Sequence, residues 1–146
     1  MGRGRGGYTQ KQLHYKYSEG KKVTDPGAIF VAERYMDAGY EAVFRQTHAP
    51  QKTYDLTIKS SDDIEYIKNI EVKQVTSSNP SKIATNIKKA NQQISDGDTI
   101  AIYLPNHKND EDGRSFAEEG LSEARRKGWI KGPVEVWFSD KTKIDY

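Results

Sequence analysis

One apolar run constrains the fold of this chain more than any other segment. It reads Thr-Ile-Ala-Ile-Tyr-Leu at residues 99–104 and is ended by Pro105. A short run rich in apolar residues is typical of a buried strand. Helical periodicity is predicted on both sides of it, from Asn79-Pro80-Ser81 to about Ser95 and again over 115–127. Strand, helix and strand in succession favour a right-handed crossover to a parallel neighbour.

The N-terminal part of the domain is predicted to contain a helix followed by three strands. Asp25 is a good N-cap, Pro26 suits the first helical position, and Gly39 ends the helix. Three adjacent strands favour hairpin pairing, so the predicted class is α/β (α+β), with a mixed central β-sheet flanked by helices. The predicted strands cover 40–46, 53–59, 66–75, 98–104 and 133–139, and 106–113 is predicted to be a polar loop.

Length and composition fit a single domain of 146 residues with a modest core. The absence of cysteine excludes disulfides and zinc–thiolate sites. We expect no signal peptide and no membrane anchor, because no apolar run is long enough. The net charge of +2 is concentrated in residues 1–25, which carry +4. Residues 1–24 are therefore expected to be a basic, flexible arm that binds nucleic acid or packs its tyrosines on the domain, which covers 25–146.

Two predicted strands carry the residues most suited to catalysis. Asp55 begins one strand, and Glu71 and Lys73 lie two residues apart on the next. Residues i and i+2 point to the same face of a strand, so Glu71 and Lys73 project together, and a hairpin would bring Asp55 beside them. Asp55 and Glu71 would then bind a divalent metal, which is expected to be Mg²⁺. Lys73 would stabilise charge on the scissile phosphate or position a water. The alternative is an ordinary solvated strand face.

Two helices offer further polar residues. Glu33 is predicted to share the apolar face of the first helix with Ile29 and Met36. A carboxylate on such a face is costly unless it is paired or binds a cation. The alternative is that Glu33 lies at the edge of that face and pairs with a surface Lys or Arg. On the next helix, a polar stripe is predicted beside the apolar one and could meet a phosphate backbone, or could simply be solvated. The stripe is formed by Lys82, Asn86, Lys89 and Gln93.

The motif and the element order over about residues 25–105 resemble the core of the PD-(D/E)xK nucleases. The resemblance implies that Glu33, Asp55, Glu71 and Lys73 are catalytic, with acidic side chains on the metal and the lysine assisting attack. Gln74 and Gln93 fall where some members carry auxiliary polar residues. Tyr54 stands where the family usually has a proline.

A narrower resemblance is carried by the basic N-terminal lead with Lys11-Gln12-Leu13-His14, the single compact core and the absence of cysteine. In these features the chain is similar to the C-terminal tRNA-cleaving toxin domains of bacterial contact-dependent growth inhibition effectors. This resemblance implies an endonuclease that hydrolyses tRNA in the cytoplasm of a target cell after delivery, and a cognate immunity protein that blocks it in the producer. Two alternatives remain: a DNA endonuclease of the same fold, of restriction or resolvase type, and a non-catalytic RNA-binding domain.

His14 is expected to be a surface residue, and the alternative is acid–base chemistry on RNA without a metal. His14, His48 and His107 have no ligand spacing, so no histidine metal site is predicted. Trp129 and Trp137 flank or lie in the last strand and are expected to complete the core.

Overall fold

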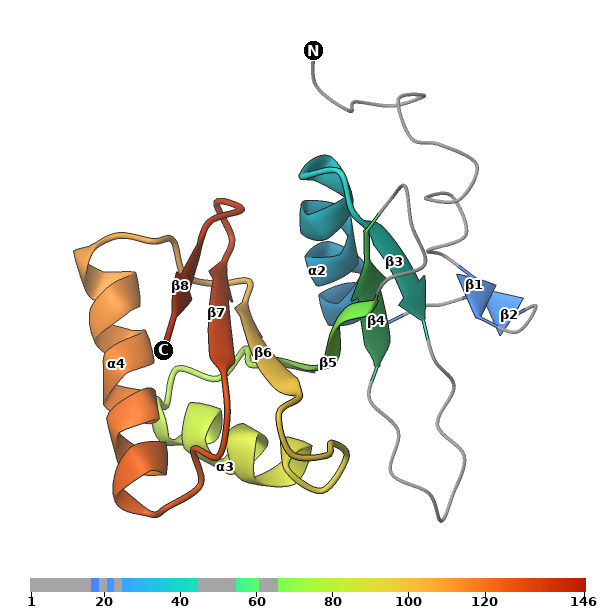
Figure 1. Cartoon of the computed structure of the whole chain (residues 1–146). Coiled ribbons are helices and arrows are strands. Elements are labelled where there is room, and N and C mark those ends of the chain that lie inside the picture. The colour runs from blue at the N-terminus through green and yellow to red at the C-terminus, as the bar shows by residue number, and fades with distance from the viewer. Residues whose placement is uncertain (1–16, 19–20, 23–24, 45–54, 61–65) are drawn as a thin grey trace. The chain divides into compact units, whose positions relative to one another are not determined.

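The computed structural model describes residues 17–18, 21–22, 25–44, 55–60 and 66–146 (Figure 1). Most of the predicted basic arm, His14, His48 and most of the turn at 60–63 lie outside these residues. Within the arm, strands β1 (Tyr17–Ser18) and β2 (Lys21–Lys22) pair antiparallel. The contacts of the chain divide it into two units, and the division falls between Ile70 and Glu71.

The first unit contains one helix and a run of antiparallel strands. These elements are α2 (Pro26–Asp37), β3 (Glu41–Phe44), β4 (Leu56–Lys59) and the first half of β5 (Tyr66–Gln74). Strand β4 pairs antiparallel with β3 and with β5, with Leu56 opposite Phe44 on one side and Ile70 on the other. The predicted hairpin pairing of three adjacent strands is confirmed for the described residues.

Helix α2 begins and ends where its local sequence predicts. The Asp25 side chain accepts hydrogen bonds from the backbone N–H groups of Gly27 (3.0 Å) and Ala28 (3.4 Å), and Pro26 follows the cap. Gly39 lies just past the helix with φ of 101°, a conformation that costs glycine little. The buried face packs on the apolar residues of β3 and β4 and is formed by Ala28, Val31, Ala32, Tyr35 and Met36.

The second unit contains the rest of β5, two helices and three more strands. The elements are α3 (Ser81–Ala90), β6 (Thr99–Leu104), α4 (Glu111–Arg126), β7 (Val134–Phe138) and β8 (Lys143–Asp145). The strands are hydrogen-bonded in the order β5, β6, β7, β8. Strands β6 and β7 are parallel and α4 connects them, so a crossover between parallel neighbours is confirmed here; β8 returns antiparallel. The fold is mixed α/β.

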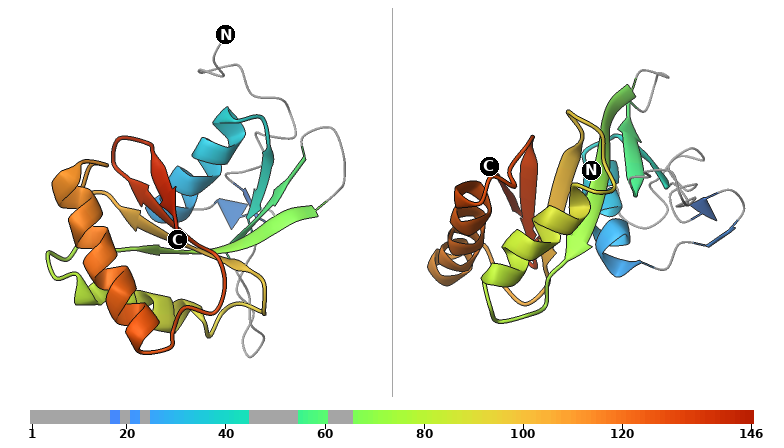
Figure 2. Two further views of the ribbon diagram at one scale, coloured as in Figure 1. Left: turned by 60° about the vertical axis from the view of Figure 1, so that its left-hand side comes forward. Right: turned by 90° about the horizontal axis from the view of Figure 1, so that it is seen from below.

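Helices α3 and α4 cover one face of β6 and β7 (Figure 2). The alternate residues Ile100, Ile102 and Leu104 of β6 pack with those of β7 against the apolar stripe of α3. The helices approach closely at Gly120, where a Cβ atom would lie 2.6 Å from both the Ile83 Cβ and the Pro80 carbonyl oxygen. The apolar stripe predicted at Ile83, Ile87, Ala90 and Ile94 is confirmed for the first three, whereas Ile94 lies beyond the end of α3. Glycine at 120 permits the close packing of this stripe.

The largest differences from the sequence-based prediction are two helix boundaries and one strand that was missed. Helix α4 begins at Glu111 instead of Ser115, because Asp110 caps it by accepting from the Gly113 N–H at 2.8 Å. Helix α3 ends at Ala90 instead of about Ser95. Strand β8 was not predicted, because a three-residue strand with one apolar residue carries almost no periodic signal.

Candidate functional site

Glu71 and Lys73 form an ion pair on β5, in the second unit. The Lys73 Nζ lies 3.3 Å from the Glu71 Oε2. The Glu71 side chain is 5% exposed and the Lys73 side chain 27% exposed, while Val72 between them is buried on the opposite face. The prediction that Glu71 and Lys73 project together is confirmed.

The face that carries this pair is the one under the two helices of the second unit. Side chains alternate along a strand, so Glu71 and Lys73 share a face with Val75. Val75 is buried in the core formed with α3 and α4. The carboxylate is therefore held in a protected environment, where removal from water is costly and an ion pair is less screened than at the surface.

Asp55 lies immediately before β4, in the first unit, and is half-buried. Its backbone N–H donates a 3.0 Å hydrogen bond to the Ile70 carbonyl. Leu56 and Ile70 are register partners, and both are fully buried. In the chain, Asp55 directly precedes Leu56, and Glu71 directly follows Ile70.

Glu33 lies beside the buried face of α2, in the first unit, and not within it. Its side chain is 31% exposed, and its Oε1 is 3.8 Å from the Arg34 guanidinium, which also pairs with Asp37 at 3.3 Å. Ile29, expected on the apolar face, is only half-buried, because the face runs through Ala28, Val31 and their helical neighbours. The sequence left open an edge position paired with a basic side chain, and that is the position observed.

The five predicted substrate-binding residues all lie in the second unit. Lys82 and Lys89 are exposed on α3, and the half-buried Asn86 donates from its Nδ2 to the Lys82 carbonyl at 2.7 Å. Gln93 falls in the turn after the helix, so the predicted stripe is one turn shorter than expected. Gln74 is exposed at the last position of β5.

The oxygen chemistry of Asp55 and Glu71 fits a hard divalent cation. Across the described ranges, no three His, Asp or Glu side chains are gathered into a metal-holding group. Two carboxylates are sufficient for Mg²⁺, which usually keeps several waters and shares its shell with substrate phosphates. The donor set therefore suits Mg²⁺ better than a metal that needs a complete protein cage.

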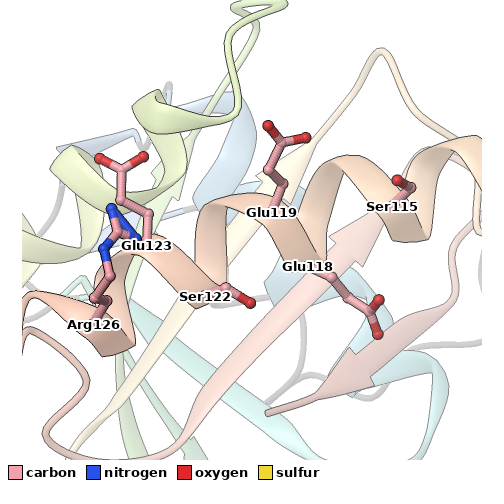
Figure 3. Close-up of a pocket in the computed structure, with 6 residues that line it drawn as sticks. All are labelled: Ser115, Glu118, Glu119, Ser122, Glu123 and Arg126. Carbon is pink, nitrogen blue, oxygen red and sulfur yellow. The ribbon is translucent and has the colours of Figure 1, made fainter.

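A shallow groove runs along the exposed side of α4 (Figure 3). Its charged groups are three carboxylates and one guanidinium, so it would repel a phosphate backbone over most of its length. At one end, hydrogen bonds from Ser81 (2.7 Å) and then Lys127 (3.1 Å) hold the pKa of Glu123 below its ordinary value. The groove is lined by Ser115, Glu118, Glu119, Ser122, Glu123 and Arg126.

Sequence reasoning placed Trp129 in the core and attached no other role to it. The residue is half-buried, packs against the core, and has the ammonium groups of Lys88 and Lys127 each 5.1 Å from its ring centroid. The sequence signal that could have indicated these lysine–tryptophan contacts is the group of basic residues at the C-terminal end of each helix, at 88–89 and 125–127.

Comparison with known proteins gives no relative: no protein-family model, curated protein or solved structure matches the chain. Of the helices in the described part of the chain, none combines the length and the apolar character needed to cross a bilayer.

Proposed function

We propose that this chain is a metal-dependent endonuclease that hydrolyses phosphodiester bonds. The observation that carries the proposal is the ion pair between Glu71 and Lys73 on one face of β5, with a carboxylate that is almost fully buried. A buried ionised carboxylate is costly unless it is paired or binds a cation. A nuclease site would explain why the Glu71 carboxylate and the Lys73 ammonium group are retained together on this face of β5.

In this proposal Asp55 and Glu71 hold the metal, and Glu33, which is paired with Arg34, is not one of its ligands. This choice of ligands rests on the sequence motif, in which Asp55 precedes one strand and Glu71 lies on the next. Bound Mg²⁺ would polarise the phosphate and lower the pKa of an attacking water. Lys73 would turn its ammonium group from Glu71 toward a phosphate oxygen and stabilise the negative charge that develops as water attacks phosphorus.

The proposed substrate is RNA, with tRNA preferred over DNA, and the proposed setting is a delivered toxin domain with an immunity protein. These parts rest on the resemblance of the basic N-terminal lead, the single compact core and the lack of cysteine to contact-dependent growth inhibition toxins. The exposed Lys82 and Lys89 support an anionic substrate. An immunity protein with acidic groups could cover the same lysines and so exclude the substrate.

The test is incubation of the purified chain with total RNA and with plasmid DNA, each with Mg²⁺ and with EDTA. Cleavage of RNA that EDTA abolishes supports the proposal. Cleavage of DNA alone indicates the DNA endonuclease, and binding of RNA without turnover in any metal indicates a non-catalytic RNA-binding domain. Harmless expression in bacteria without a partner protein would contradict the toxin assignment.

The first variant to examine is Asp55→Asn, which keeps the shape of the side chain and removes its charge. We expect loss of cleavage with little change in the thermal midpoint. Asp96→Asn is the matched control, because Asp96 is exposed in a turn outside the proposed site. Wild-type cleavage by Asp55→Asn would remove this residue from the mechanism.

A further inference from the structure

The C-terminal ends of α3 and α4 lie together and carry a cluster of basic side chains around one tryptophan. The Asn91 Nδ2, just after α3, donates to the Trp129 carbonyl at 2.8 Å, and the Trp129 N–H donates to the Ala124 carbonyl of α4 at 2.9 Å. The backbone N–H and the backbone carbonyl of Trp129 are therefore both held by hydrogen bonds. We call the group formed by Lys88, Lys127 and Trp129 the Trp129 cluster.

Two ammonium groups are held near the same indole. The Nζ atoms of Lys88 and Lys127 are each 5.1 Å from the Trp129 ring centroid. An exposed cation–π contact contributes only about 0.5–1 kcal/mol, so either lysine can exchange it for a phosphate contact. The arrangement places two potential phosphate contacts beside one aromatic ring.

One of the two lysines carries uncompensated charge. Lys127 pairs with Glu123 at 3.1 Å. Lys88 is exposed and, within the described residues, has no carboxylate within ion-pair distance. Basic residues at each helix end also complement its dipole. That effect explains the lysines of each helix separately, but not an aromatic ring placed between the two groups.

We propose that the Trp129 cluster binds single-stranded nucleic acid, with Lys88 and Lys127 on backbone phosphates and the Trp129 ring stacked on an unpaired base. Basic side chains that follow the backbone, combined with an aromatic ring, are the usual means of holding unpaired strands. The cluster continues the polar stripe of α3, since Lys88 adjoins Lys89. The proposal rests on the proposed nuclease function for its substrate class, and it extends substrate binding from α3 to the end of α4.

The test is fluorescence anisotropy with a short labelled single-stranded RNA, in EDTA so that no cleavage occurs. We expect Lys88→Ala/Lys127→Ala to bind more weakly and to reduce the slope of log affinity against log salt by about 1.4, since each lost contact to a single strand removes about 0.7. The matched control is Lys108→Ala/Lys141→Asn, which removes the same charge from exposed positions outside the cluster. Asparagine is chosen at 141 because that residue has φ of 73°.

Trp129→Leu keeps an apolar side chain against the core and removes the stacking ring. It should bind the single strand about 5- to 150-fold more weakly, whereas Trp129→Phe should keep most of the affinity. The thermal midpoint of each variant shows whether the fold is retained. If Trp129→Leu does not fold, the double lysine variant and quenching of tryptophan fluorescence by RNA in Trp137→Phe decide the question.

Three results would overturn the proposal. The double lysine variant could bind as tightly as its control, duplex RNA could bind as tightly as the single strand, or polyglutamate could compete as well as RNA does. The last result would assign the cluster to an acidic polypeptide. Because binding is measured without metal, the two proposals can fail separately. A wild-type chain that binds through the cluster but never cleaves RNA would refute only the nuclease function. A chain that cleaves RNA but binds it elsewhere would refute only the role of the cluster.

Discussion

Strands β5 and β8 carry the same chemical pair in different surroundings. Each has a lysine and a carboxylate two residues apart, joined in an ion pair: Lys73 with Glu71, and Lys143 with Asp145. The lysines are similarly exposed, at 27% and 29% of the side chain, but the Glu71 side chain is 5% exposed and that of Asp145 is 71% exposed. The two pairs therefore differ in the burial of the carboxylate, which the spacing alone does not determine.

This difference separates a candidate site from an ordinary surface contact. An exposed ion pair contributes about 0–1 kcal/mol and is easily replaced by water. A buried carboxylate needs a compensating partner, and its retention calls for a structural or chemical reason. Four substitution experiments test whether burial of the carboxylate distinguishes the two pairs.

The largest expected effect is on cleavage by Glu71→Gln. The substitution keeps the shape and removes the charge that the proposed metal requires, so the rate of RNA cleavage should fall by about 10²-fold or more. Asp145→Asn makes the equivalent change on β8 and should cleave at the wild-type rate. Cleavage is measured with Mg²⁺ beside the thermal midpoint of each variant. Equal activity of the two variants would show that burial does not identify the site.

Lys73→Gln should lower cleavage by about 10²-fold, because it removes a charge aimed at the transition state. It should also lower the free energy of unfolding by about 1–3 kcal/mol, since a buried carboxylate loses a partner. Lys143→Gln is the control, with a stability change of about 0–1 kcal/mol and no change in cleavage. Urea unfolding and a Mg²⁺ titration of the rate separate stability from chemistry. A Lys73→Gln variant with unchanged turnover would leave the lysine a structural role only.

Gly120→Ala tests the helix packing that covers the face carrying Glu71. A new Cβ would lie 2.6 Å from the Pro80 carbonyl oxygen, so α3 and α4 must separate. We expect a loss of about 1–3 kcal/mol in the free energy of unfolding. Gly132→Ala is the control, because its Cβ would lie 3.4 Å from the Asp98 carbonyl oxygen, an ordinary contact. Similar urea midpoints for the two variants would contradict the close helix approach.

The smallest expected effect concerns the turn that leads into β8. The Asp140 carboxylate accepts hydrogen bonds from the Thr142 hydroxyl (2.6 Å) and the Asn109 N–H (3.0 Å), which hold its pKa below the ordinary value of 3.8. A lowered folded-state pKa contributes stability that is fully present above the unfolded-state pKa and lost as pH falls through the folded-state pKa. Asp140→Asn should therefore lower the thermal midpoint slightly at pH 6 and progressively less below pH 3.8.

Asp96→Asn, whose carboxyl is exposed in a turn, is the control for that pH series. A constant difference between wild type and Asp140→Asn at every pH would show that the charge of Asp140 does not act in the turn. In that case the stability of β8 would depend more on its pairing with β7 and on the Lys143–Asp145 ion pair than on the turn.

Much of the fold could be predicted because its signals are local. The Asp25–Pro26 cap and the Gly39 stop each act within a few residues and are found as predicted. The apolar stripe of α3 is found at Ile83, Ile87 and Ala90 but not at Ile94, which lies beyond the helix. The start of α4 was misplaced because Asn109 to Gly113 has the composition of a loop. Its cap depends on a backbone geometry in which a Cβ at 113 would lie 1.8 Å from the Lys108 carbonyl oxygen.

The two-residue spacing of Glu71 and Lys73 was enough to predict that they project together, because a strand repeats every two residues whatever surrounds it. Their surroundings came from the fold: Glu71 is buried while Asp145 is exposed, and Lys88 and Lys127, 39 positions apart in the chain, meet at Trp129. Burial and such contacts depend on which elements pack against each other. That packing is set by the sum of many weak apolar contacts across the chain and leaves no signal in any short window of sequence.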